Sequence, residues 1–456
     1  MTMNLLGNGV VVTGWGGPDD PAPEILPAGA VAWDEGRIVA VGAADALQHS
    51  YPAAECLDAH GGLVIPGLVN LHHHFYSALA RGLDPRTPMR NFTEVLDRLW
   101  WRLDRALDPE TIGLSARLSA ADCIRWGCTT VFDHHASPSY IDGSLDVIAE
   151  ALETAGLRGV LCYEITDRNG SEQAERGLEE NLRFLAARAE HPTVRGVMGL
   201  HASFTLRNRT LEQVAARRPA NGGCHIHVAE DPVDVVTSKA EFGVEPVQRL
   251  AGFDLLDDRA LLAHGIHLDP DAYELAAAHG ATLIHNPESN ANNGVGRLDV
   301  PETTAHGCRV GLGTDGMSSS VLRALRSAFL LHRAGRQDPD SGFDALPDLL
   351  GTNVRVARRF LGEPLLGRLT PGAPADLIAI DQPPPTPLTT ENLFAHLVYG
   401  VPEAAVRHTI AGGAVLLRDF RHTTLDPAEL AARAREATPA LWDRFHANPW
   451  GTSFLG

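Results

Sequence analysis

The sequence is poor in cysteine and has no long apolar run. Six of its 456 residues are cysteines, and none of them forms a Cys-x-x-Cys pair. This usage excludes a disulfide scaffold and is typical of buried thiols in a reducing compartment. The first residues lack a basic segment followed by an apolar core, so we expect no signal peptide. No apolar run approaches the roughly 20 residues of a membrane span, and we expect a cytoplasmic protein without a membrane partner.

Basic residues are scarce relative to acidic ones. The chain holds 38 Lys and Arg against 57 Asp and Glu, which gives a formal net charge of −19. Such a charge argues against a nucleic-acid partner or an anionic membrane, because both are themselves negatively charged. A small-molecule substrate remains compatible with it. Apolar residues make up 44% and charged residues 21%, which is the balance of an ordinary globular protein.

The middle of the chain, residues 63–365, alternates short apolar strands with helical stretches. We expect strands at 63–71, 130–133, 159–165, 194–201, 224–228, 260–265, 282–286 and 310–314. This alternation predicts parallel strands covered by helices, an α/β fold. Eight strands in about 300 residues suit a (β/α)8 TIM-type barrel. A doubly wound open sheet is the alternative.

The two ends of the chain predict a separate, smaller β domain. Residues 1–62 hold β-rich runs separated by Gly and Asp, and Asp34-Glu35-Gly36 is typical of a hairpin turn. Residues 366–425 begin with a turn-rich segment and continue with short apolar strands. We expect both parts to complete one composite β-sandwich domain. Residues 426–456 are expected to form a C-terminal helix and tail.

The first strand of the middle region ends in three consecutive histidines. Side chains alternate along an extended chain, so His72 and His74 point the same way. Two imidazoles on one face supply half of a metal site. A solvated histidine run is the alternative, but such a run rarely follows directly on a buried strand.

Other strands of the middle region also end in residues that bind metals or carry protons. In barrels of this kind the working residues lie at the carboxyl ends of the strands. The relevant residues are His227 near the end of the fifth strand, Glu230 just past it, His264 at the end of the sixth and Asp315 at the end of the eighth. Three imidazoles and a carboxylate suit a catalytic Zn²⁺ or Fe²⁺ ion, and that set is His72, His74, His227 and Asp315. Such an ion turns a bound water into hydroxide near neutral pH, while nearby carboxylates move protons.

Further residues are weaker candidates for the pocket. His201 ends the fourth strand and is compatible with a substrate contact or with an ordinary hydrogen-bonded histidine. Asn290 follows the seventh strand and could bind a polar substrate edge, although Asn-rich turns are common without function. For two histidines after the second strand we favour structural roles: His134 and His135. Two tryptophans could wall a pocket for a flat ring, although packing in the core or at an interface is the default interpretation of such a pair: Trp100 and Trp101.

These motifs together resemble the amidohydrolase superfamily, in its cytosine deaminase and chlorohydrolase branch. The resemblance covers nearly the whole chain and is carried by Pro66-Gly67 with His72-His73-His74, His227-Val-Ala-Glu230, Ala263-His264-Gly265 and Gly313-Thr314-Asp315. Within the branch the chain is similar to 8-oxoguanine deaminases at His73-His74-Phe75-Tyr76. It is more similar to the SsnA-type aminohydrolases over the segments 99–107, 133–138, 166–170, 225–231 and 289–293.

The resemblance implies a barrel, a composite β domain, a homodimer and one divalent metal ion per chain, zinc or alternatively Fe²⁺. The implied ligands are His72, His74, His227 and Asp315. Glu230 would carry a proton to a ring nitrogen, His264 would hold the water and the tetrahedral intermediate, and His201 would touch the substrate. Two-metal members use a bridging lysine at the fourth strand, and residues 199–202 contain none.

The expected function is that of a metal-dependent aminohydrolase, a deaminase that releases ammonia from a purine, pyrimidine, pterin or similar heterocycle. Metal-bound hydroxide would attack, and Asp315 would pass the water proton to the leaving amine. Chlorohydrolases often lack the glutamate at the position of Glu230, so its presence favours deamination. Two alternatives stay open: a non-deaminating hydrolase acting by dechlorination or cyclic amide hydrolysis, and a catalytically inactive scaffolding relative.

Overall fold

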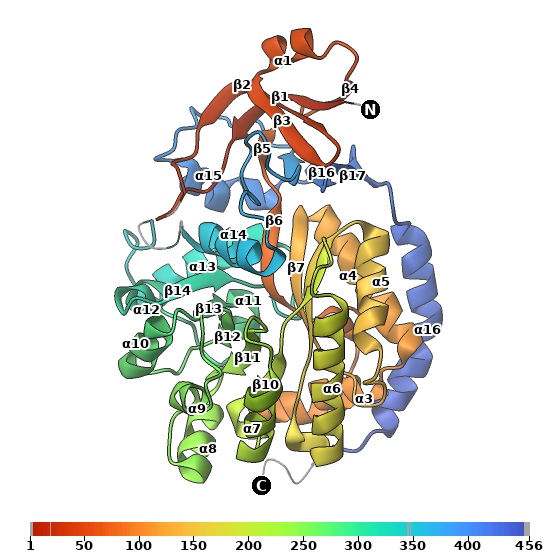
Figure 1. Cartoon of the computed structure of the whole chain (residues 1–456), viewed down its shortest axis with the longest axis vertical. Coiled ribbons are helices and arrows are strands. Elements are labelled where there is room, and N and C mark those ends of the chain that lie inside the picture. The colour runs from red at the N-terminus through yellow and green to blue at the C-terminus, as the bar shows by residue number, and fades with distance from the viewer. Residues whose placement is uncertain (1–2, 19, 344–345, 347, 451–456) are drawn as a thin grey trace.

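The computed structural model describes residues 3–18, 20–343, 346 and 348–450, and it is an α/β fold (Figure 1). Parallel strands from the middle of the chain form two sheets whose strand order follows the sequence. The first contains β6 (Leu68–His73), β7 (Cys128–His135), β8 (Arg158–Tyr163) and β9 (Val194–Gly196). The second contains β10 (Gly199–Ala202), β11 (Cys224–Val228), β12 (Ala260–His264), β13 (Thr282–His285) and β14 (Arg309–Leu312). Single parallel bridges pair Ile165 with Leu200 and His73 with Asp315.

Helices follow these strands and lie outside them in Figure 1. Many begin at a residue that satisfies the free N–H groups of a first helical turn. In α4, for example, the Asp108 side chain accepts a hydrogen bond from Thr111 N, and Pro109 takes the first position. These helices are α4 (Pro109–Arg125), α5 (Ser144–Ala155), α6 (Ser171–Ala187), α7 (Asn208–Arg217), α8 (Pro232–Phe242), α9 (Pro246–Gly252), α10 (Pro270–Ala278), α11 (Pro287–Asn293), α12 (Val300–Ala305), α13 (Val321–Arg336) and α14 (Asp348–Leu361).

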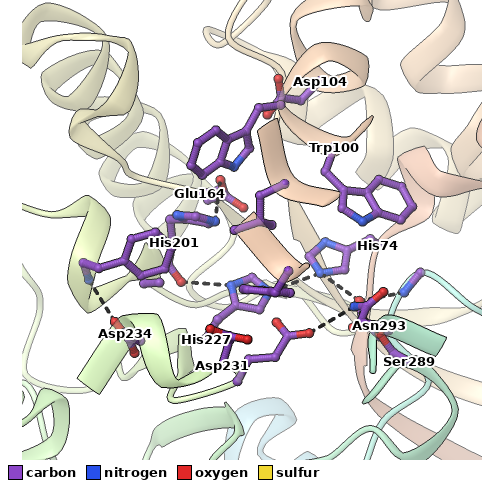
Figure 2. A pocket seen from close by; sticks show the side chains of 18 of the residues that line it. His74, Trp100, Asp104, Glu164, His201, His227, Asp231, Asp234, Ser289 and Asn293 are labelled. Atoms are coloured by element: carbon purple, nitrogen blue, oxygen red, sulfur yellow. Dashed lines mark hydrogen bonds and ion pairs between the residues drawn. The ribbon is translucent and has the colours of Figure 1, made fainter. Parts of the chain in front are cut away.

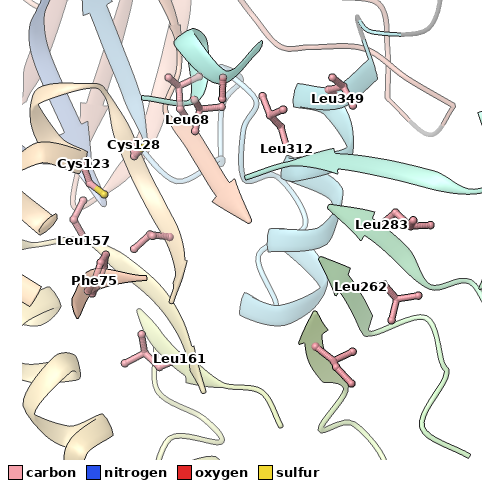
Figure 3. Packing of buried hydrophobic residues seen from close by; sticks show 14 of the residues in the cluster. Leu68, Phe75, Cys123, Cys128, Leu157, Leu161, Leu262, Leu283, Leu312 and Leu349 are labelled. Atoms are coloured by element: carbon pink, nitrogen blue, oxygen red, sulfur yellow. The ribbon is translucent and has the colours of Figure 1, made fainter. Parts of the chain in front are cut away.

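Apolar side chains from these strands and helices pack into one large buried cluster. Figure 3 shows part of it, with Leu161 on β8 of the first sheet and with Leu262, Leu283 and Leu312 on the neighbouring strands β12, β13 and β14 of the second. Burying one leucine side chain stabilises a fold by about 1.5–3 kcal/mol. The cluster therefore fixes the positions of the strands, and with them the positions of the polar residues at the strand ends.

Strands from both ends of the chain share a nine-stranded sheet. The N-terminal strands are β1 (Asn4–Val12), β2 (Ile25–Asp34), β3 (Arg37–Ala43), β4 (Glu55–Asp58) and β5 (Leu63–Pro66). The C-terminal strands are β15 (Leu377–Ile380), β16 (Val406–Ala411), β17 (Ala414–Arg418) and β18 (Arg421–His422). The two groups meet where β5 and β15 pair antiparallel, with Leu63 opposite Ile380. The expected hairpin turn joins β2 to β3 through Glu35 and Gly36, which have φ values of 47° and 77°.

The strand expected over 63–71 is divided at Gly67. β5 belongs to the nine-stranded sheet, whereas β6 belongs to a parallel sheet. A Cβ atom at Gly67 would lie 2.4 Å from Oγ1 of Thr129, so glycine lets the chain pass between the two sheets. Both halves of the run are buried, which is why the apolar pattern shows no break.

The last helix, α16 (Pro427–Ala447), packs along the outer side of the helices that follow β6 (Figure 1). Leu430 lies in a buried cluster with Leu114 of α4, and Trp442 Nε1 donates a hydrogen bond to the Leu79 carbonyl. Shorter helices complete the chain: α1 (Ala44–Ser50), η1 (Phe75–Ala80), α2 (Phe92–Val95), η2 (Leu96–Trp100), α3 (Trp101–Ala106), η3 (Asp167–Asn169), η4 (Ser203–Thr205), α15 (Leu393–Tyr399) and η5 (Val401–Glu403). Within the described ranges, no helix combines the length and the apolar character that crossing a membrane requires.

Candidate active site

A pocket of about 820 Å³ lies at the carboxyl ends of the parallel strands (Figure 2). One wall is aromatic and comes from α2, the π-helical turn η2, α3 and η4: Phe92, Trp100, Trp101 and Phe204. A single π-helical turn is rare and often marks a functional site. Both tryptophans line the pocket and also pack in a buried apolar cluster, which was the default interpretation of the pair. Ionisable side chains from the strand ends form the rest of the lining.

His74 and His227 present two ring nitrogens to each other without a proton between them. Nδ1 of His74 lies 2.6 Å from the His134 carbonyl oxygen, and Nδ1 of His227 lies 2.9 Å from the His201 carbonyl oxygen. A carbonyl only accepts, so each Nδ1 must carry the ring hydrogen and each Nε2 is left with a lone pair. The two Nε2 atoms are 3.2 Å apart. Two lone pairs at this distance repel each other, and a cation bound by both would remove the repulsion.

His72 and Asp315 point into the same small volume. Nε2 of His72 is buried and has no hydrogen-bond partner among the described residues. Asp315 Oδ1 lies 3.9 Å from that atom and 3.2 Å from His74 Nε2. One ligand atom from each of His72, His74 and Asp315 lies within 4.8 Å of the others. The four residues that the sequence predicted as metal ligands are thus brought together, and their donor atoms fit a divalent cation that binds nitrogen and oxygen.

The protonation states of these residues also suit metal binding. Burial, followed by the neighbouring His74 ring, holds the pKa of His72 well below its usual value. Burial also lowers the pKa of His74, and it holds that of His227 well below the usual value. Burial acts to raise the pKa of Asp315, but the His74 and His264 rings outweigh it and lower the pKa to about 2. Neutral imidazoles and an ionised carboxylate are the forms that bind metals.

Three residues at the site have left-handed backbone conformations, which non-glycine residues rarely adopt. The φ values are 46° at Ala229, 76° at His264 and 54° at Asp315. The N–H of Asp315 donates to the His72 carbonyl at 2.9 Å, and this bond holds the turn against β6. Strain of this kind persists where the surrounding structure imposes it, and it concentrates at functional sites.

Glu230 lies beside the cluster and faces His264. Its Oε2 is 3.4 Å from His264 Nε2, and its Oε1 accepts a hydrogen bond from Asn293 Nδ2 at 3.1 Å. Burial is the main cause that raises the pKa of Glu230, to about 7. A carboxyl group with this pKa exchanges a proton readily near neutral pH. His264 itself is fully buried, and its Nε2 lies 3.9 Å from Asp315 Oδ2.

Asn290, expected to touch the substrate, lies behind His264. Its Oδ1 is 2.8 Å from Nδ1 of His264, its side chain is fully buried, and it is not among the residues that line the pocket. Asn290 projects from the side of α11 that faces the end of β12, so it orients the histidine ring. Asn293, one turn further along α11, lines the pocket instead.

A group of charged residues that the sequence analysis did not single out forms another part of the lining: Asp104, Glu164 and Arg168. Nη2 of Arg168 contacts a carboxylate oxygen of Asp104 and lies 3.1 Å from Glu164 Oε1. The Trp101 ring lies 5.1 Å below the guanidinium carbon. Burial raises the pKa of Glu164 to about 7, although Arg168 lowers it. Glu164 directly follows β8, so an inspection of every strand end would have found it.

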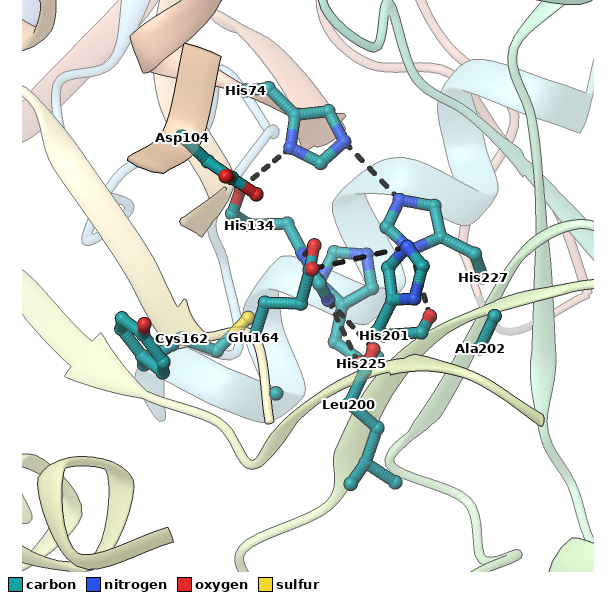
Figure 4. A network of polar contacts seen from close by, with 12 residues as sticks. His74, Asp104, His134, Cys162, Glu164, Leu200, His201, Ala202, His225 and His227 are labelled. Carbon is teal, nitrogen blue, oxygen red and sulfur yellow. Dashed lines mark hydrogen bonds and ion pairs between the residues drawn. The ribbon is translucent and has the colours of Figure 1, made fainter. Parts of the chain in front are cut away.

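The two histidines expected after the second strand, His134 and His135, are the last two residues of β7 and have structural contacts, as favoured from the sequence. Nε2 of His134 lies 3.1 Å from the Leu200 carbonyl oxygen and 3.2 Å from that of His225 (Figure 4). Nε2 of His135 lies 2.9 Å from Ser137 Oγ. Because carbonyls only accept, Nε2 of His134 carries the hydrogen and its Nδ1 is left with a lone pair.

Comparison with known proteins gives one family and close structural neighbours. Residues 63–416 match the amidohydrolase family. A 5-methylthioadenosine/S-adenosylhomocysteine deaminase of Desulforudis audaxviator is 33% identical over 427 residues, which are 91% of this chain and 95% of the relative. A protein of the same name from Nitratidesulfovibrio vulgaris is 30% identical over 93% of this chain and 96% of its own length. A crystal structure of an adenosine deaminase from Xanthomonas campestris with bound zinc superposes with a TM-score of 0.83 at 23% identity, covering 97% of this chain and 98% of that one.

Proposed function

The chain belongs to the amidohydrolase family, as its motifs predicted, and on this premise we propose that it is a metal-dependent deaminase. It releases ammonia from an amino-substituted heterocycle by hydrolysis of a carbon–nitrogen bond. Relatives named as adenosine-type deaminases support a purine or a similar ring as the substrate. The observation that carries the proposal is the position of Glu230, a carboxyl group with a pKa of about 7, beside the unprotonated nitrogens of the histidine cluster.

The residues that would hold the metal are His72, His74, His227 and Asp315. We propose one ion per chain, Zn²⁺ or alternatively Fe²⁺, because both accept this set of nitrogen and oxygen donors. When bound, such an ion supplies a nucleophile by lowering the pKa of a coordinated water towards neutrality. The facing lone pairs of His74 and His227 support this assignment, because Asp315, which also lies near Nε2 of His74, offers only acceptor oxygens when it is ionised.

Proton transfer falls to the residues of this chain. Glu230, held in place by Asn293, gives a proton to the ring nitrogen next to the reacting carbon. His264, whose Nδ1 hydrogen is engaged by Asn290, offers its free Nε2 to a hydroxyl that forms at that carbon. Oδ1 of Asp315 faces the histidines and Oδ2 faces His264. The ionised Asp315 carboxylate would accept the proton of the attacking water and pass it to the leaving amine, which departs as ammonia.

We also propose that the two parallel sheets close into one (β/α)8 barrel over residues 63–365. The single bridges from His73 to Asp315 and from Ile165 to Leu200 support closure, because they lie at the two places where the sheets adjoin. In the same proposal, residues 1–62 and 366–425 form the composite β-sandwich domain, and residues 426–456 form the C-terminal helix and tail. Residues 1–2, 19 and 451–456 of these ranges lie outside the described residues.

The function is tested by ammonia release from the metal-loaded protein. The panel contains amino-purines, oxidised purines, amino-pyrimidines and pterins, and Asp315→Asn serves as the blank because it removes one proposed ligand. We expect at least one compound to release ammonia with the wild type and none with the variant. Bound metal without ammonia from any compound would contradict deamination and favour hydrolysis of another bond.

A further inference from the structure

The proposed mechanism gives no role to two ionisable residues that form one wall of the pocket. Glu164 follows β8 and His201 belongs to β10, and both line the pocket next to His227. One ligand atom from each of these three residues lies within 4.8 Å of the others. This wall therefore lies beside the histidine cluster, where the reacting carbon of a substrate must lie, and not at the distant end of the pocket.

The wall presents hydrogen-bond acceptors. Thr205 donates its hydroxyl hydrogen to the Ala202 carbonyl, so its oxygen accepts from Nδ1 of His201 at 2.5 Å. Nε2 of His201 is then left with a lone pair, and it lies 3.9 Å from Oε1 of Glu164. The lone pair at Nδ1 of His134 lies 3.7 Å from Oε2 of Glu164. Acceptors that face one another in a buried wall need N–H or O–H groups from a ligand.

The same wall is unfavourable to anions. Among the described residues that line the pocket, Arg168 is the one permanently charged cation. Its side chain is 4% exposed, and Asp104 and Glu164 already hold its Nη2. Glu230 and Asp315 add further carboxyl groups to the lining. The carboxyl groups of Asp104 and Glu164 compensate the charge of Arg168, although its Nε and Nη1 have no hydrogen-bond partner among the described residues. A phosphate or carboxylate on the ligand would therefore meet an excess of negative charge.

The two sides of the reacting carbon then differ in chemistry. That carbon has two ring neighbours, and Glu230 protonates the nitrogen on one side. Figure 2 shows Glu164 and His201 on the opposite side of His227 from Asn293, the partner of Glu230. In a cyclic guanidine such as guanine, isocytosine or pterin, the second ring neighbour is an N–H group. In adenine and cytosine that neighbour is a carbon atom, which donates no comparable hydrogen bond.

We infer that Glu164 and His201 receive a ring N–H beside the reacting carbon, so that the substrate is an uncharged or cationic cyclic guanidine and not an adenine nucleoside. The inference rests on the proposed deaminase function and names its substrate class. A second divalent cation is the other occupant that acceptors could bind. The guanidinium of Arg168, 3.1 Å from Glu164 Oε1, would repel such an ion.

The test compares kcat/KM for guanine, isocytosine and pterin with kcat/KM for adenine, adenosine and cytosine, using the metal-loaded protein. Guanine methylated on its lactam nitrogen lacks the donor, and guanosine monophosphate adds an anion. We expect turnover of the cyclic guanidines and a loss of about 10- to 100-fold on methylation, the effect of leaving buried acceptors unpaired. The phosphate should abolish turnover. Glu164→Gln should cause a similar loss with guanine and little change with methylated guanine.

Glu180→Gln is the matched control. Glu180 is a buried acid on α6 that accepts hydrogen bonds from Leu145 N and Arg183, and it does not line the pocket. Its substitution should leave the ratio between guanine and methylated guanine unchanged. If Glu164→Gln does not fold, Glu164→Asp, which keeps the carboxylate, and the methylation series in the wild type decide the question.

The possible results distinguish a wrong substrate class from a wrong deaminase function. Faster turnover of adenine compounds than of cyclic guanidines, unaffected by Glu164→Gln, would overturn the inference and leave the deaminase function intact. Two metal equivalents in the wild type and one in Glu164→Gln would assign the acceptors to a cation and would also overturn it. No ammonia from any compound, with metal bound, would contradict the deaminase function and the inference together.

Discussion

Substitution of Glu230 by glutamine tests the proposed proton transfer separately from side-chain position and metal content. Glutamine has the same shape, and its amide oxygen can still accept the hydrogen bond from Asn293 Nδ2 that Glu230 accepts at 3.1 Å. The side chain should therefore keep its position, while the proton that the carboxyl group exchanges near its pKa of about 7 is lost. Glu230 is not one of the proposed metal ligands, so metal content should not change.

The expected loss of activity in Glu230→Gln follows from the role of Glu230 in proton transfer. A positioned acid or base contributes about 10²- to 10⁴-fold to a rate, which corresponds to about 3–5 kcal/mol of transition-state stabilisation. We expect kcat for ammonia release to fall by that factor in Glu230→Gln, with a much smaller change in KM. The assay is steady-state ammonia release on the best substrate of the panel, with metal content measured on the same sample.

Glu288→Gln provides the control for this substitution. Glu288 lies on α11 near the site, accepts hydrogen bonds from Ser318 and Ser327, and does not line the pocket. Its substitution should leave kcat within about a factor of three of the wild type. Unchanged turnover in Glu230→Gln, with metal retained, would refute the assignment of Glu230 to proton transfer.

Three further predictions concern stability and are measured by urea unfolding. Gly67→Ala should lower the free energy of unfolding by about 1–3 kcal/mol, because the added Cβ would overlap the Thr129 side chain. Gly42→Ala is the control and should be nearly neutral, because no atom lies within 4 Å of the added Cβ. Equal effects of the two substitutions would contradict the close approach at Gly67. Asp376→Ala should lower the free energy of unfolding by about 3–5 kcal/mol, because it leaves Arg158, whose Nε lies 2.8 Å from Asp376 Oδ2, as an uncompensated buried charge. A loss of about 1 kcal/mol or less, as for an exposed ion pair, would contradict this prediction. Burial raises the pKa of Asp133 to about 8, so the folded state retains a proton that the unfolded chain releases near pH ~4. The free energy of unfolding should therefore fall as pH rises between these values, and Asp133→Asn should flatten the fall; an unchanged pH dependence would contradict it.

The metal cluster was accessible from the sequence because its chemistry restricts both residue type and position. Imidazoles two residues apart on a strand must share a face, and strand ends in a parallel fold gather at one edge. His72, His74, His227 and Asp315 therefore meet as predicted. Their function as ligands remains a prediction that metal analysis must test.

Other features depend on contacts that a sequence pattern does not contain. Whether Asn290 or Asn293 faces the pocket depends on the rotation of α11 about its axis, and tertiary contacts such as the hydrogen bond between Asn290 and His264 of β12 fix that rotation. The pairing of Asp104 with Arg168 joins segments far apart in the chain, and neither residue stands in a pattern that reveals its partner. The division at Gly67 is hidden because burial continues on both sides of it.

Deamination by this protein should depend on a metal ion that the histidine cluster holds. The most direct measurement is a titration of Zn²⁺ into chelated protein, with bound metal and ammonia release followed on the same sample. We predict that activity rises in proportion to bound metal and reaches its maximum at one equivalent per chain, and that His227→Asn neither binds the ion tightly nor releases ammonia. Full ammonia release from the chelated protein, with no metal detectable, would contradict a metal-dependent reaction at this site.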